Sequence, residues 1–344
     1  MSDQVSIVTC ARDQFSCIDA HLTLLTRETA PEVPIVAVIG GAPQHLRQEW
    51  ERRHGGRVRF RFEERFLSHP AAHNLGLRLV ETPLAVTMET DTFPRPGWLE
   101  PLLACQRETG AMMVVPLILE RPRRIHCAGN DLYITYEEDG RGFGHKTLRM
   151  MGFPYAARSN LTRRRTDYGE LHCQLIQVEP TLRLAAYDER IMEVGEVDSS
   201  LTWAAAGGEL WCEPRSVVHF VEDAPLRAQD VPFFLWRWDL AEIRRGYDVF
   251  QAKWGFDITE HGEFRRFLMR RHERLGFLAR RLPYDSVLEL GRVVRSGAWK
   301  VRHALALPDK LWFALRARDL GYDAWPTYPE QRLNEDEQGH PLLR

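Results

Sequence analysis

Several features are missing from this sequence of 344 residues. None of its six cysteines belongs to a C-x-x-C pair, so their spacing gives no support for a zinc ribbon. No run of about 18 apolar residues occurs, so we expect no transmembrane helix. The first residues contain no basic segment followed by an apolar stretch, so we expect no signal peptide. These absences favour a reduced, cytoplasmic, globular protein.

A large excess of charge of either sign is also missing. Lys and Arg total 46 and Asp and Glu total 48, which gives a formal net charge of -2. Such a chain has no overall attraction to a phosphate backbone, so we expect no nucleic acid partner. Hydrophobic residues make up 44% of the chain, which is enough for a large core, and the length suggests about two domains.

What the sequence does contain is a regular alternation of apolar segments and helical patterns through about the first 90 residues. We predict strands at residues 5–9, 35–39, 58–62 and 84–88. Between them, we predict helices around residues 18–25, 44–53 and 70–81. This order is typical of an α/β protein with a mostly parallel sheet and helices on both faces.

The acidic triplet Glu89-Thr90-Asp91 directly follows the fourth predicted strand. In parallel sheets, ligands bind beyond the carboxyl ends of the strands, so this position is typical of a binding site. A Mg²⁺ or Mn²⁺ site often uses one or two carboxylates together with substrate phosphates. Taken alone, the triplet favours a polar strand end that enters a loop over a binding site.

The second half of the chain has a different pattern. We predict strands at residues 111–119, 175–178 and 210–220, long loops with short strands over 121–165, and helices over 231–253 and 261–282. The last of these helices carries seven arginines and two glutamates. It could lie peripherally on the anionic inner face of a membrane, or it could be the solvated face of a packed helix.

Residues 74–99 resemble family-2 glycosyltransferases of the GT-A fold. They contain Asn74-Leu75-Gly76, an apolar strand, the acidic triplet and Pro96-Gly97-Trp98-Leu99, in the order typical of that family. Further matching segments are Tyr187-Asp188-Glu189, Gly195-Glu196-Val197-Asp198, residues 206–214 and Val217-Val218-His219. Together they extend the resemblance over residues 5–220, about two-thirds of the chain.

The resemblance implies a domain organisation and an activity. A GT-A domain would occupy residues 1–225, a helical C-terminal extension residues 226–330 and a polar tail residues 331–344. The implied reaction transfers a sugar, with inversion, from a nucleotide-diphosphate donor to an acceptor hydroxyl. It would use a divalent metal, Mn²⁺ or Mg²⁺. The acceptor would be a glycan, a lipid-linked molecule or a small molecule.

The resemblance also implies roles for individual residues. The nucleotide sugar would be bound by Thr9, Ala11, Arg12, Asn74, Glu89, Thr90 and Asp91. The metal ligands would be Asp91, Glu89 and His219. The catalytic base would be Glu196, with Asp198 as a helper or as the base itself. Glu170 and His172 would lie on the acceptor side.

Three departures from the family pattern leave alternatives open. The triplet begins with Glu89 rather than Asp, and Gly195-Glu196 replaces Glu-Asp. The acidic anchor for the nucleotide base is replaced by Gly40-Gly41-Ala42-Pro43, so the base and the sugar stay undetermined. The chain could therefore be a catalytically silent relative that binds a sugar nucleotide or a partner protein. A nucleotide-dependent oxidoreductase is disfavoured because Cys10-Ala11-Arg12-Asp13 stands where a G-x-G-x-x-G turn is needed.

Overall fold

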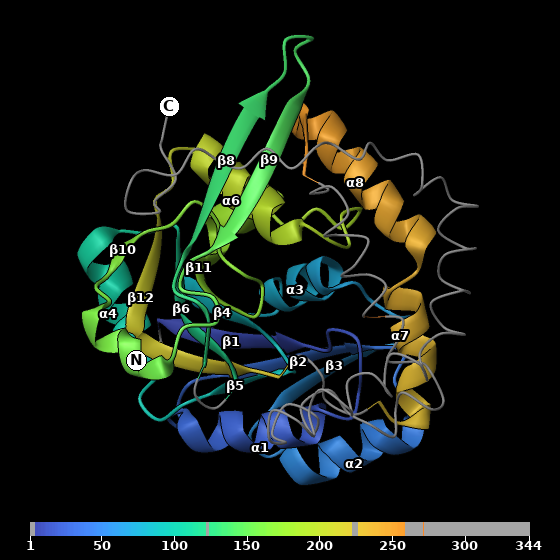
Figure 1. The fold of residues 1–344 in the computed structure, drawn as a ribbon. Helices are drawn as coiled ribbons and strands as arrows, with labels where there is room; N and C mark the ends of the chain where they lie inside the picture. The colour runs from blue at the N-terminus through green and yellow to red at the C-terminus, as the bar shows by residue number, and fades with distance from the viewer. Residues whose placement is uncertain (1–3, 122–123, 222–225, 259–270, 272–344) are drawn as a thin grey trace, which may run out of the picture.

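The computed structural model describes residues 4–121, 124–221, 226–258 and residue 271. Its centre is a ten-stranded sheet whose main path has the order β10-β12-β6-β11-β4-β1-β2-β3 (Figure 1). In that order the strands are Arg164–Arg165, Leu210–Phe220, Met113–Arg121, Cys173–Gln177, Leu84–Glu89, Val5–Cys10, Ile35–Gly40 and Arg59–Glu63. Two further strands lie off this path: β5 (Thr92–Pro94) pairs with β12, and β7 (Arg124–Cys127) pairs with β6.

Most neighbouring strands on the main path run parallel. β1 is parallel to both β2 and β4, β3 is parallel to β2, and β12 is parallel to β6. The exceptions are β11, which is inserted antiparallel between β4 and β6, and β10, which pairs antiparallel with β12. The predicted α/β class with a mostly parallel sheet is therefore confirmed, and the predicted strands of the first 90 residues each form within one residue of the expected bounds.

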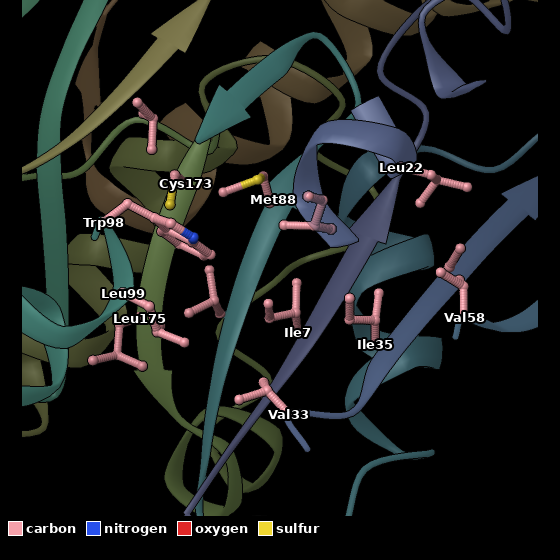
Figure 2. Packing of buried hydrophobic residues seen from close by; sticks show 14 of the residues in the cluster. Ile7, Leu22, Val33, Ile35, Val58, Met88, Trp98, Leu99, Cys173 and Leu175 are labelled. Atoms are coloured by element: carbon pink, nitrogen blue, oxygen red, sulfur yellow. The ribbon is translucent and has the colours of Figure 1, made fainter. Parts of the chain in front are cut away.

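Helices cover both faces of this sheet (Figure 1). α1 (Ile18–Glu28), α2 (Gln44–His54) and α4 (Leu99–Thr109) contribute to one buried cluster, which also contains Ile7 and Ile35 (Figure 2). Val8 and Val36, the next residues along the same strands, lie in other clusters that include residues of α3 (His69–Leu77). Alternate strand residues thus meet helices on opposite faces, which explains the continuous apolar runs in the sequence.

The segment Asn74-Leu75-Gly76 lies on α3 and brings this helix close to the sheet. A Cβ atom on Gly76 would lie 2.2 Å from Cγ1 of Val8 in β1, so a larger residue would force the helix away. The helix begins with Ser68 as its N-cap and ends at Leu77, four residues before the predicted end. The close approach fixes α3 beside the strand ends that carry the acidic triplet.

The region predicted as long loops contains a long hairpin. β8 (Asn130–Tyr136) and β9 (Gly142–Leu148) pair antiparallel over seven residues each, and β13 (Phe256–Asp257) joins them in a second, three-stranded sheet. The hairpin is visible at the top of Figure 1. Apolar side chains alternate in β8 at Leu132, Ile134 and Tyr136, and this alternation is the signal that indicates the strand. The short helix η1 (Tyr155–Asn160) follows.

Five helices are described in the C-terminal part: α5 (Val178–Arg183), α6 (Gly195–Ala205), η2 (Ala228–Asp230), α7 (Val231–Arg237) and α8 (Leu240–Trp254). The helical segment predicted at 231–253 is divided because the Asp239 side chain caps α8, accepting from the backbone N–H groups of Ala241 and Glu242. Phe234 and Ile243 of these helices share a core cluster with Tyr168 and Val197.

Residues 226–258 thus pack directly against the sheet-bearing part of the chain. The basic helix expected at 261–282 lies outside the described residues except for Arg271, and so does the polar tail at 331–344. Among the helices that the structure describes, none has both the length and the apolar character needed to cross a membrane.

Candidate active site

The acidic triplet is held by backbone hydrogen bonds where β4 ends. The N–H of Glu89 donates to the carbonyl of His172, and the N–H of Thr90 donates to the carbonyl of Cys10. The carbonyl of Asp91 accepts from the N–H of Val221, just beyond β12. Three strands of the sheet therefore fix the triplet at the carboxyl end of β4, as the parallel architecture predicts.

His172 brings a third metal-ligating group to the triplet. Its Nδ1 atom lies 2.7 Å from Oε2 of Glu89, and ligand atoms of Glu89, Asp91 and His172 all lie within 4.8 Å of one another. All three residues are buried. His126, Glu170 and His172 form a second group that meets the same distance criterion, so His172 is common to both groups. The sequence assigned His172 to the acceptor side, whereas the structure places it between the triplet and Glu170.

Arg12 lies against both acidic residues of the triplet. Its guanidinium is 3.1 Å from Oδ2 of Asp91 and 3.7 Å from Oε2 of Glu89, and it packs over the rings of Phe220 and Trp238. Burial raises the pKa of both carboxyl groups, while Arg12 acts in the opposite direction. Burial lowers the pKa of Arg12, but the two acids outweigh this effect and hold it above its ordinary value. Arg12 is therefore a permanent cation that two acids share.

The donor set of the triplet fits a divalent metal ion. Glu89 and Asp91 offer carboxylate oxygens, and burial holds the pKa of His172 well below its ordinary value, so its ring is neutral and can donate a lone pair. Magnesium prefers oxygen ligands alone, whereas a mixed set of carboxylates and imidazole suits a first-row transition ion. The residues present therefore fit a first-row transition ion better than Mg²⁺.

Two further glutamates lie close to this cluster. Burial and the negative charge of Glu196 raise the pKa of Glu170 to about 7. Glu196, in the first turn of α6, accepts a hydrogen bond from Nζ of Lys146 in β9 at 3.1 Å. Oε2 of Glu170 is 3.9 Å from Nε2 of His172. Glu170 is thus the link between the metal-ligating residues and Glu196.

The structure does not bring Asp198 and His219 into this cluster. Asp198 accepts hydrogen bonds from Trp254 and pairs with Lys253, both on α8. His219 belongs to neither metal-ligating group of the described residues, and its neighbour Phe220 stacks on the His172 ring instead. Since successive residues of a strand point to opposite faces, the position of Phe220 directs His219 away from the triplet.

The remaining predicted residues have structural partners. Thr9 hydrogen bonds through Oγ1 with Nε2 of His21, and Ala11 is buried in the core beside Arg12. Asn74 donates to the carbonyl of Tyr187 and to Oε1 of Glu189, so it joins α3 to the segment that precedes α6. Two motifs of the family resemblance are therefore in direct contact.

His69 is one of the residues near the site that were not predicted from the sequence. His69, the first residue of α3, is buried, and neither of its ring nitrogens has a hydrogen-bond partner among the described residues. A Cβ atom on Gly195 would lie 3.5 Å from its Nε2, which places the ring beside the start of α6. Burial holds its pKa well below the ordinary value, so the ring is neutral. In the sequence its position before Pro70 indicated only a helix start.

Comparison with known proteins supports the fold. No family model and no curated protein sequence matches this chain. Among solved structures, the chain is similar to a crystal structure of GalNAc-T7 with UDP, GalNAc and Mn²⁺, with a TM-score of 0.51 and 16% sequence identity. The similarity covers 77% of this chain and 54% of that one, so this chain spans about half the length of its structural neighbour. At this identity the similarity shows the fold, which is the predicted GT-A fold.

Proposed function

We propose that this protein is a glycosyltransferase that moves a sugar from a nucleotide-diphosphate donor to an acceptor hydroxyl. The observation that carries the proposal is the convergence of Glu89, Asp91 and His172 in one buried group at the carboxyl end of β4. The GT-A fold places the group where such sheets bind ligands. The structural neighbour was solved with UDP and Mn²⁺, which agrees with this class of donor.

In this proposal the triplet holds a divalent metal, with Mn²⁺ favoured by the imidazole of His172. When bound, the metal offsets the negative charge of the departing diphosphate. Arg12 supplies a second, permanent positive charge at the same place and can hydrogen bond to phosphate oxygens. The carboxylates of Glu89 and Asp91 position these charges rather than touching the sugar.

The acceptor side is formed by Glu170 and Glu196. A general base is most effective when its pKa is near the working pH, and the pKa of Glu170 is raised to about 7. Glu196 stands where the resembled family has its base, and Lys146 holds its carboxylate in place. We propose that these two glutamates act as a coupled pair that accepts the proton of the attacking hydroxyl. Direct attack opposite the diphosphate would invert the anomeric configuration.

One observation favours a second candidate function. Arg12 already neutralises part of the charge of Glu89 and Asp91, so the triplet is stable in the fold without a metal. A catalytically silent relative could bind a sugar nucleotide through Arg12 without a metal ion or a catalytic base. The two candidates differ in whether the function of the protein requires the metal and the glutamate pair.

A thermal-shift assay with sugar nucleotides tests both candidates, the transferase and the silent relative, against an unrelated function. The full chain is titrated with UDP-, GDP- and dTDP-sugars, with Mn²⁺ or with EDTA, and its melting temperature is recorded. A transferase should be stabilised by one class of donor, and more strongly with Mn²⁺, because ligands that bind the native state stabilise it. Stabilisation that EDTA leaves unchanged would favour the silent relative, and no stabilisation by any donor would contradict both.

The base is tested by replacing each glutamate with glutamine. With the donor identified above, Glu170→Gln and Glu196→Gln should each lower turnover by a factor of about 10²–10⁴, the usual contribution of a general base. Glu179→Gln, on the exposed surface of α5, is the matched control. Full activity in both site variants would exclude the glutamate pair while leaving donor binding intact.

A further inference from the structure

A second polar site is formed on the β5–β12 side of the sheet. A pocket of about 430 Å³ is lined by the side chains of Arg95, Arg158 and Arg215 together with Tyr155. Its residues come from the segment after β5, from η1 and from β12. None of them belongs to the metal-ligating groups of the described residues.

The backbone holds each arginine at the rim of this pocket. Arg95 donates its backbone N–H to the carbonyl of Val217, which ties the end of β5 to β12. Arg215 lies in the irregular part of β12, where the register with β6 shifts between Glu213 and Val217. Such irregularities redirect side chains and are common beside functional sites. Arg158 follows Tyr155 by three residues in η1, so both extend from one short helix.

The charges in this pocket are not balanced. The guanidinium carbons of Arg95 and Arg158 lie 5.1 Å and 4.1 Å from the ring centre of Tyr155, so one ring contacts two like charges. Neither arginine forms an ion pair with an acidic residue in the described part of the chain, whereas Arg215 is paired with Glu213 at 2.8 Å. Among the described residues, about two positive charges are therefore left without an acidic partner.

The positive charge of Arg95 also affects the pKa of His219. Burial and then the charge of Arg95 lower the pKa of His219, which lies on β12. His219 was predicted as a metal ligand, but its surroundings are cationic rather than acidic. The charge of Arg95 therefore extends from the pocket to His219.

We propose that this pocket binds a phosphate monoester. Arginine forks match phosphate oxygens in geometry, and a dianion matches the two unpaired charges. The triplet is a different kind of site, because its carboxylates attract metal ions. Asp91 and Arg95 are four positions apart in the chain, so their Cα atoms are at most about 14 Å apart. The pocket itself does not depend on the proposed transfer reaction.

The proposal is tested by titrating the full chain with inorganic phosphate in a calorimeter at constant ionic strength. We expect one saturable site at the pocket. We expect the double variant Arg95→Gln/Arg158→Gln to bind at least about tenfold more weakly, equivalent to about 1.4 kcal/mol, because it loses both charge-assisted hydrogen bonds to the phosphate. Arg95→Lys/Arg158→Lys should recover part of the affinity because it keeps the charge. Arg183→Gln, an exposed arginine of α5, is the matched control.

A vesicle-pelleting assay distinguishes a lipid phosphate from the phosphate of a soluble ligand. Met151 and Phe153, each 54% exposed, precede η1 and could contact acyl chains beside the pocket. Pelleting with phosphatidic acid vesicles but not with phosphatidylcholine vesicles, lost in the glutamine double variant, identifies a lipid phosphate. Phosphate binding without pelleting identifies a soluble ligand. No phosphate binding, or equal binding by the folded double variant, overturns the proposal whether or not the chain is a transferase.

Discussion

Asp91 and Asp198 are both buried carboxylates of this fold, but their surroundings differ. Burial raises the pKa of each. Asp91 shares one cation, Arg12, with Glu89, and His172 completes the group. Asp198 has Lys253 at 2.8 Å and the indole N–H of Trp254 at 2.8 Å.

This difference separates a centre that can take up a ligand from one that holds the fold together. At the triplet two acids share one arginine, so a further cation can still be accommodated. At Asp198 one acid meets one lysine, and the pair connects α6 to α8 with no net charge left over. Burial of a carboxylate therefore does not by itself indicate a functional site. The balance of charge around the carboxylate is the more informative feature.

The strongest test of this comparison is Asp91→Asn. Losing one carboxylate removes a proposed metal ligand and the main partner of Arg12. If the proposed transfer reaction is correct, turnover of the identified donor should fall by about 10³-fold or more, equivalent to about 4 kcal/mol of transition-state stabilisation. The free energy of unfolding should change by less than about 1 kcal/mol, because Glu89 still neutralises Arg12. Turnover is measured with the donor found by thermal shift, and unfolding with urea.

Two other outcomes of the Asp91→Asn experiment would contradict this expectation. If the variant kept its turnover and its additional stabilisation by Mn²⁺, the triplet would be a structural feature like Asp198. If it unfolded instead, the ion pair with Arg12 would be the main role of Asp91.

Much of this site follows from local sequence, because the triplet ends an apolar strand and parallel strands bring their ends together. The role of His172 could not be predicted in this way. It depends on β11, which enters antiparallel between β4 and β6, so that a residue 83 positions away reaches Glu89. The same limit affected Asp198, whose partners on α8 lie more than 50 residues later and meet it only through packing. Sequence periodicity predicts elements, whereas such contacts depend on the order of strands and helices.

A buried polar group can also be satisfied without any charge, and His21 provides this third case. Its Nδ1 lies 2.7 Å from the carbonyl of Thr92 and its Nε2 lies 2.9 Å from Oγ1 of Thr9. Burial lowers its pKa from its ordinary 6.5 to about 4. As pH falls below 6.5 the unfolded chain takes up the proton first, so His21 should cost about 3 kcal/mol of stability by pH 4, and none of this above pH 6.5.

The variant His21→Gln isolates this contribution. Urea unfolding is measured at several pH values between 4 and 7.5, and the slope of stability against pH should decrease by up to about 1.4 kcal/mol per pH unit. The variant is also less stable at neutral pH because its hydrogen bonds change, but that difference does not depend on pH. An unchanged slope would show that the pKa of His21 is the same in the folded and the unfolded chain.

The smallest effect on turnover is expected at the balanced pair, Asp198 and Lys253. Asp198→Asn should lower the free energy of unfolding by about 2 kcal/mol, because Lys253 is 30% exposed and can be solvated by water once its partner is neutral. Lys253→Met should cost more, about 3 kcal/mol, since it leaves the completely buried Asp198 carboxylate without its cation.

The double variant at this pair completes the comparison with the triplet. Asp198→Asn/Lys253→Met should be less destabilised than the sum of the single variants, since neither charge is then left alone. Turnover per folded molecule should stay within about twofold of the wild type in all three variants, because Asp198 faces α8 and not the acceptor side. A large fall in turnover with normal stability would instead make Asp198 the base, and the balance of charge would no longer distinguish the two centres.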